Sequence, residues 1–79
     1  MPRYYFHLHG KQTRRADEHG VELPDGEAAW YQAVRSGREV IRADLHLGLP
    51  FDDQMIEIAD ARGTPLEHIQ LADIARYAM

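Results

Sequence analysis

The stretch Asp17-Glu-His-Gly-Val-Glu-Leu-Pro-Asp-Gly-Glu-Ala-Ala29 is the most informative part of the chain, because it has the pattern of a turn, a short strand and the start of a helix in succession. Gly20 suits the turn, since glycine adopts backbone conformations that other residues avoid. Asp25 suits the helix N-cap, where its carboxylate accepts a bond from a free amide of the first turn. Glu27, in that turn, interacts favourably with the helix dipole. The stretch therefore predicts a strand that leads directly into a helix.

After this stretch, apolar residues recur at intervals of three and four, which is typical of one face of a helix. They are Trp30, Ala33, Val34, Gly37, Val40, Ile41 and Leu45. The spacing predicts an amphipathic helix of about five to six turns, which Gly48 ends and Pro50 keeps from continuing. Gly37 costs about 1 kcal/mol relative to alanine in a helix interior. Close packing of the helix on a sheet would explain its presence.

Strand patterns lie on both sides of this helix. In residues 2–9, Tyr4, Phe6 and Leu8 occupy alternate positions, which is the period of a half-buried strand. A second short strand near Arg15 or at residues 21–23 would pair with it in a loose hairpin.

The chain after the helix predicts further strands. Residues 55–59 alternate again, and a turn at residues 60–63 leads to a third main strand at residues 66–71. Residues 72–79 have apolar side chains at helical spacing, so a short helical tail could cover a sheet edge. The order β(β)-α-β-β is α+β, with one long amphipathic helix packed on a small antiparallel sheet. We expect residues 1–79 to form a single domain with a thin core.

Composition excludes several classes of protein. The 79-residue chain has no cysteine, so it can form neither a disulfide nor a cysteine-ligated zinc site. The longest apolar run is far shorter than the ~20 residues that span a bilayer. The N-terminus also lacks the apolar region of a signal peptide. We therefore expect a cytoplasmic protein that does not associate with membranes.

Few side chains could serve as a nucleophile. The chain has one serine, Ser36, inside the predicted helix, and two threonines, Thr13 and Thr64, in predicted turns. It has no Gly-x-Ser-x-Gly motif and no phosphate-binding glycine loop. We therefore expect neither enzymatic activity nor a cofactor.

A group of basic and aromatic side chains lies on the helix face opposite the apolar stripe. The group consists of Tyr31, Arg35, Arg38, Arg42 and His46. Arginine favours planar partners such as carboxylates and phosphates, so this arginine face could bind an anion or a partner as well as face solvent. The net charge of −4 opposes generic binding to a phosphate backbone. A protein partner is therefore favoured over nucleic acid.

His7 and His9 project from the same face of the first strand, about 7 Å apart along the backbone. Two imidazoles at this spacing could chelate a transition metal if a carboxylate from a neighbouring strand completed the site. The same pattern also fits two histidines on a solvent-exposed strand face. No third ligand can be identified from the sequence.

Most of the acidic residues near the helix start have a simpler explanation than cation binding. They are Asp17, Glu18, Glu22, Asp25 and Glu27. Their spacing matches no calcium loop, so we interpret them as turn and cap residues. Asp44 lies on the inward stripe of the helix, where a carboxylate needs a partner. We expect it to reach solvent or an arginine from another segment.

Several motifs together resemble a family of short bacterial proteins that is described only as a domain of unknown function. They are Met1-Pro-Arg-Tyr-Tyr-Phe-His7, the segment Asp17-Glu-x-Gly-Val-Glu-Leu-Pro-Asp25, Ile56-Glu-Ile58 with Asp60 and Gly63, and Ala72-Asp73. The resemblance runs nearly end to end and implies a stand-alone domain without an assigned activity, cofactor or site. The chain departs from the family pattern at Asp44, His9 and His68.

The sequence favours a small non-catalytic protein-interaction domain that self-associates, as a homodimer. A short sheet leaves exposed edges, and Tyr4, Tyr5, Trp30 and Tyr31 exceed what a thin core can bury. The alternatives are a nucleic-acid-linked regulatory module that uses the arginine face, and a metal-dependent activity through His7 and His9.

Overall fold

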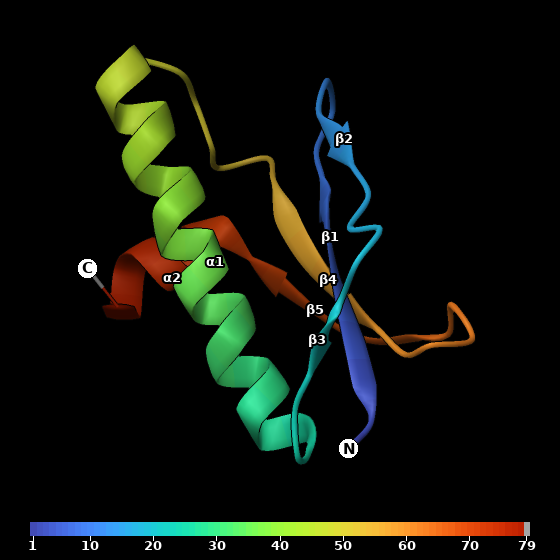
Figure 1. Cartoon of the computed structure of the whole chain (residues 1–79). Coiled ribbons are helices and arrows are strands. Elements are labelled where there is room, and N and C mark those ends of the chain that lie inside the picture. Colours follow the sequence, from blue (N-terminus) through green and yellow to red (C-terminus); the bar gives the residue numbers. More distant parts are fainter. Residues whose placement is uncertain (79) are drawn as a thin grey trace.

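The computed structural model describes the backbone of residues 1–78 and the side chains of residues 1–76 (Figure 1). The elements follow the chain as β1 (Arg3–His9), β2 (Arg14–Arg15), β3 (Val21–Glu22), α1 (Gly26–Leu47), β4 (Met55–Ala59), β5 (Pro65–Gln70) and α2 (Leu71–Ala78). Both helices lie on one side of an antiparallel sheet (Figure 1). The predicted α+β class and the order of the main elements are confirmed.

The sheet has the strand order β2-β1-β4-β5, and β3 also pairs with β1. Both positions considered for the second short strand therefore form strands. β1 and β4 pair with His7 opposite Glu57, and β4 and β5 pair with Glu57 opposite His68. Because opposed residues share a face of the sheet, these three side chains lie on the face opposite the helices, which we name the open face. The third main strand ends at Gln70, since Leu71 already begins α2.

Asp17 closes the gap between β2 and β3 along the edge of β1. Its carboxylate accepts a hydrogen bond from Phe6 N at 3.1 Å, and its own N–H donates to Nδ1 of His7 at 3.0 Å. The carboxylate also accepts bonds from the N–H groups of His19 and Gly20, both at 3.1 Å. Gly20 has φ of 69°, in the left-handed region that favours glycine. The segment that predicted a turn therefore also completes the edge of β1.

Helix α1 has the predicted caps. The side chain of Asp25 accepts a hydrogen bond from Ala28 N at 2.9 Å, and Gly48 ends the helix with φ of 71°. Trp30 and Leu45 were predicted on the buried face, but they are 40% and 59% exposed. For Leu45 the reason is length: 22 residues of α1 span about 33 Å, whereas the five residues of β4 span about 17 Å, so the C-terminal end of α1 extends past the core. Trp30 is exposed because Ala29 and Ala33, only 1% and 0% exposed, occupy the core at its level of the helix.

The glycine at position 37 allows α1 to pack closely against α2, more than against the sheet. A Cβ atom at Gly37 would overlap Cδ1 of Ile74 and lie 3.1 Å from Cδ2 of Leu71, both on α2. Ile74 and Leu71 are buried. Helix α1 therefore lies close to α2, and it also contacts β4. The predicted helical tail packs against α1, while residues 66–68 of the β5 edge stay exposed. Met79, the last residue of the predicted tail, lies outside the described residues.

Neither helix in the described part of the chain is long and apolar enough to cross a membrane.

Candidate functional site

The outer edge of β5 is the first candidate site. Leu71 N donates to Gln54 O at 3.0 Å, so these opposed residues form a hydrogen-bonded pair. Bonded and non-bonded pairs alternate in an antiparallel ladder. The N–H and C=O groups of Glu67 and Ile69 therefore point toward β4, and those of His68 point away from the sheet. No described strand pairs with this side of β5.

The two edges of the sheet differ in how they are protected. On the β1 side, two short strands and the Asp17 carboxylate occupy the backbone groups. On the β5 side, Pro65 and a register shift at Ile58/Ala59 interrupt only the beginning of the strand. From Glu67 to Gln70 the strand is regular and carries no lysine or proline, which are common protections of natural edges. The β5 edge is thus open to pairing.

A histidine–glutamate cluster lies on the open face beside this edge. Oε1 of Glu57 lies 3.3 Å from Nε2 of His68 and 3.4 Å from Nε2 of His9. Nε2 of His9 is buried and makes no hydrogen bond within the described residues. The cluster joins three strands, β1, β4 and β5. Sequence reasoning missed it because it depends on the cross-strand register.

The described residues do not assemble the metal site predicted at His7 and His9, although Glu57 on the neighbouring strand lies beside His9. Nδ1 of His7 accepts the bond from Asp17 N, and the rings of His7 and His9 lie 6.4 Å apart at 70°. Among the described residues, no group of three histidine, cysteine, aspartate or glutamate side chains could hold a metal ion.

The residues of the arginine face lie on one side of α1, and all but Arg38 are exposed. Tyr31 is 62% exposed, and its ring meets that of Trp30 edge-on at 5.2 Å. Arg35, Arg42 and His46 are exposed, whereas Arg38 is half-buried with an Nε that has no hydrogen-bond partner within residues 1–76. Arg35 and Glu39, which are four residues apart on α1, form no ion pair among the described residues.

Asp44 has a different partner from the one predicted. Its Oδ2 accepts a bond of 2.9 Å from Nε2 of Gln54, and that amide also donates to Pro50 O at 3.3 Å. Gln54 is only 5% exposed. The inward carboxylate is therefore satisfied by a buried amide and not by an arginine or by solvent alone. This contact links the end of α1 to the start of β4.

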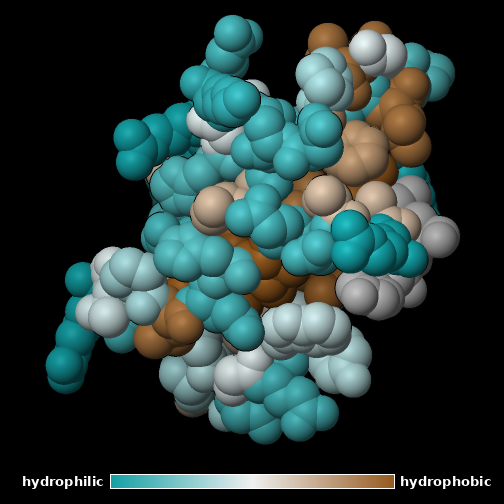
Figure 2. Space-filling model, turned by 180° about the vertical axis from the view of Figure 1, so that it is seen from behind, coloured by the Kyte–Doolittle hydropathy of each residue, from teal (hydrophilic) through white to brown (hydrophobic). Residues whose placement is uncertain are grey.

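Three exposed leucines lie around the C-terminal end of α1. Seen from behind, this end of the helix is one of the hydrophobic areas on a mostly hydrophilic surface (Figure 2). Leu45, Leu47 and Leu49 are 59%, 67% and 52% exposed. We name these three residues the leucine cluster.

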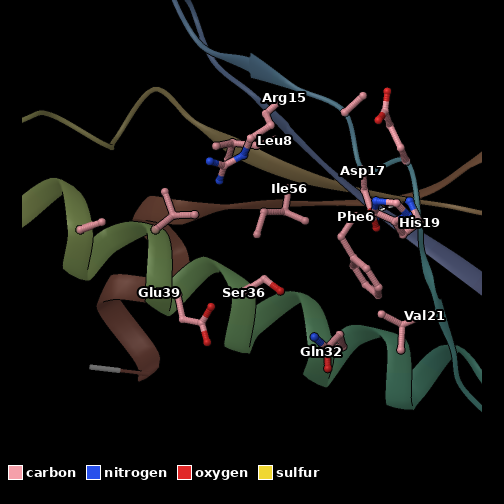
Figure 3. A pocket seen from close by; sticks show the side chains of 14 residues that line it. Phe6, Leu8, Arg15, Asp17, His19, Val21, Gln32, Ser36, Glu39 and Ile56 are labelled. Carbon is pink, nitrogen blue, oxygen red and sulfur yellow. Dashed lines mark hydrogen bonds between the residues drawn. The ribbon is translucent and has the colours of Figure 1, made fainter.

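A groove between α1 and the β1–β2–β3 side of the sheet is the third candidate site (Figure 3). It consists of two hollows with volumes of about 520 and 650 Å³. Both hollows are lined by Leu8, Arg15, Val40 and Ala43, so they lie next to each other along the groove. Phe6 projects from β1 into it (Figure 3). Because α1 lies close to α2, it covers less of the sheet over β1 than over β4.

The carboxylate of Asp17, at the rim of this groove, has a shifted pKa. Burial raises its pKa, but the hydrogen bonds from Gly20, Phe6 and His19 stabilise the charged form more strongly. The pKa of Asp17 therefore lies below the ordinary aspartate value.

Comparison with known proteins identifies only a family. The family model described as "Domain of unknown function (DUF6894)" matches residues 3–72. No curated protein and no solved structure matches the chain significantly.

Proposed function

Because the chain belongs to the DUF6894 family, whose description names no function, we propose one from the geometry: a self-associating, non-catalytic interaction domain. In this proposal, the outer edge of β5 pairs with β5 of a second copy and forms a homodimer. The observation that carries the proposal is the outward-pointing backbone of His68 on a regular, exposed strand. Such an edge is a template for another strand.

The backbone geometry restricts this pairing to registers centred on Leu66, His68 or Gln70. Of these, His68 is the one in the middle of the strand, away from Pro65 and from the start of α2. A two-fold axis normal to the sheet places a residue opposite its own copy, and only residues with outward backbone groups can form bonded pairs. Centring the axis on His68 satisfies both conditions, with His68 opposite His68 of the second copy. Centring it on Glu67 would oppose two carboxylates and would require groups that already bond to β4.

The His68 register also gives compatible neighbours. Glu67 lies opposite Ile69 of the second copy on the helix side, and Leu66 lies opposite Gln70 of the second copy on the open face. Leu66 is 52% exposed in the single chain. Pairing would cover it, and it would join two thin sheets into one continuous sheet.

Sedimentation equilibrium tests this proposal with three matched variants. We expect the wild-type chain to reach a mass of twice 9.1 kDa as concentration rises. His68→Lys opposes two fixed positive charges and should shift the equilibrium to monomer, whereas His68→Ala should leave the dimer intact. Leu47→Ser, in the leucine cluster, should have no effect.

Two results would overturn this assignment. One is a wild-type chain that stays monomeric at millimolar concentration. The other is a dimer that Leu47→Ser dissociates and His68→Lys does not, because the leucine cluster would then be the interface. Thermal unfolding of each variant shows that a loss of dimer is not a loss of fold.

A nucleic-acid-linked role for the arginine face is a second candidate. Arg35 and Arg42 are exposed, and neither has a carboxylate within 4.0 Å among the described residues. Binding to phosphates would weaken steeply as salt is raised. A salt-insensitive interaction with an oligonucleotide, or none, would count against this role.

A further inference from the structure

We propose that the groove between α1 and the β1–β2–β3 side binds a basic peptide segment that carries apolar side chains. This site lies on the helix side, away from the β5 edge, and does not depend on self-association. Its floor is apolar, and its rim is acidic. Both features come from residues that the dimer proposal leaves unused.

The apolar floor consists of side chains that the core does not fully cover. Phe6 and Val40 are half-buried and pack against the core from the groove side, with Leu8 and Ile56 beneath them. In Figure 3 the labelled side chains of Phe6 and Ile56 lie between α1 and the strands. The opening exists because Gly37 lets α1 lie close to α2, on the opposite side of the helix.

The rim carries many more carboxylates than basic groups. The acidic residues that line the two hollows are Asp17, Glu18, Glu39, Asp44, Asp52 and Asp53. The only lysine or arginine side chains lining them are Lys11 and Arg15. Glu18, Glu39 and Asp52 are exposed and have no ion-pair partner among the described residues. A ligand with positive charge is therefore favoured, and an anionic one is disfavoured.

The size and edges of the groove favour a short extended peptide. The lining residues of α1 run from Gln32 to Asp44, a stretch of helix that rises about 18 Å. An extended peptide of about six residues has this length. The edge of β1 is already closed by β2, Asp17 and β3. The peptide would therefore bind through its side chains and not as an added strand.

The ligand's own geometry matches this arrangement. In an extended peptide with alternating leucine and lysine, the leucines share one face and can contact the floor. The long lysine side chains can reach the rim while their apolar stems cover the walls.

Titration followed by NMR tests the proposal with three synthetic peptides of equal length. One alternates leucine and lysine, one replaces lysine by glutamate, and one replaces leucine by serine. We expect saturable binding of the leucine–lysine peptide alone, with amide shifts centred on Phe6, Val40 and Ala43. Binding of either other peptide with the same affinity, or shifts centred elsewhere, would overturn the proposal.

Variants of the protein give the second arm of the test. Glu39→Lys reverses a rim charge and should weaken binding roughly fivefold. Ala43→Arg places a bulky cation in the shared part of the groove and should weaken it further. Glu27→Lys makes the same charge change outside the groove and serves as the control. An equal loss in Glu27→Lys and Glu39→Lys would show that only net charge matters.

The peptide proposal and the dimer proposal can be refuted independently of each other. The same titration on the monomeric His68→Lys variant should give an unchanged affinity, because His68 lies outside the groove lining. Loss of peptide binding in that variant alone would contradict an independent groove site.

Discussion

Replacing Asp17 by asparagine should lower the free energy of unfolding by about 2 kcal/mol at neutral pH. Oδ2 of Asp17 accepts a 3.1 Å bond from the part-buried N–H of Phe6, and Oδ1 accepts bonds from His19 N and Gly20 N. Asparagine can keep the two bonds at Oδ1, although without the negative charge. It places an NH₂ group against Phe6 N, and that N–H then has no acceptor. A buried donor without a partner costs about 1–3 kcal/mol.

The same carboxylate makes stability depend on pH. The folded-state pKa of Asp17 lies below its unfolded value, so the folded chain holds this proton less tightly. The stabilisation is therefore fully present above the unfolded pKa of about 3.9. It is lost as pH falls through the lower pKa of the folded state. Asparagine cannot titrate, so Asp17→Asn should lack this part of the acid sensitivity.

Urea unfolding at pH 7 and at pH 3 measures both effects. The wild type should exceed Asp17→Asn in stability at pH 7, and the difference should shrink at pH 3. Glu18→Gln is the control, because Glu18 is exposed and should change stability by less than about 0.5 kcal/mol. An Asp17→Asn variant as stable as the wild type at pH 7 would refute the role of this carboxylate at the β1 edge. A difference that persists unchanged at pH 3 would refute the titration argument.

Two further substitutions test the packing and the cap of α1. Gly37→Val should destabilise the fold by about 1–3 kcal/mol, because its side chain would overlap Ile74 and crowd Leu71; a variant as stable as the wild type in urea would contradict close contact between α1 and α2. Asp25→Ala removes the bond to Ala28 N and should cost about 1 kcal/mol. The resulting drop in melting temperature is about 4–8 °C for a domain of this size, and no drop would contradict the cap.

The features that depend only on residues close together in the sequence could be predicted from it. Asp25 caps the start of α1 with its side chain, and Gly48 ends the helix in a left-handed backbone conformation. The alternation of apolar residues in residues 2–9 and 55–59 predicted β1 and β4. The hydrophobic pattern could not predict how far a helix extends past its sheet. For this reason Leu45 was expected to be buried and is exposed.

The candidate sites depend on contacts between distant segments. Glu57 meets His9 and His68 only because three strands adopt one register. The groove exists because Gly37 brings α1 toward α2 and away from β1, and a glycine in the apolar stripe does not indicate which element approaches it. No local pattern carries this information.

Amide hydrogen exchange at His68 reports directly on β5 pairing between two copies. In the single chain the N–H of His68 points outward, whereas those of Glu67 and Ile69 bond to β4 and serve as internal controls. If β5 pairs with β5 of a second copy, the His68 N–H exchanges rapidly at low micromolar concentration and becomes protected at millimolar concentration, while the two controls are protected at both. Rapid exchange of His68 at millimolar concentration would contradict this pairing.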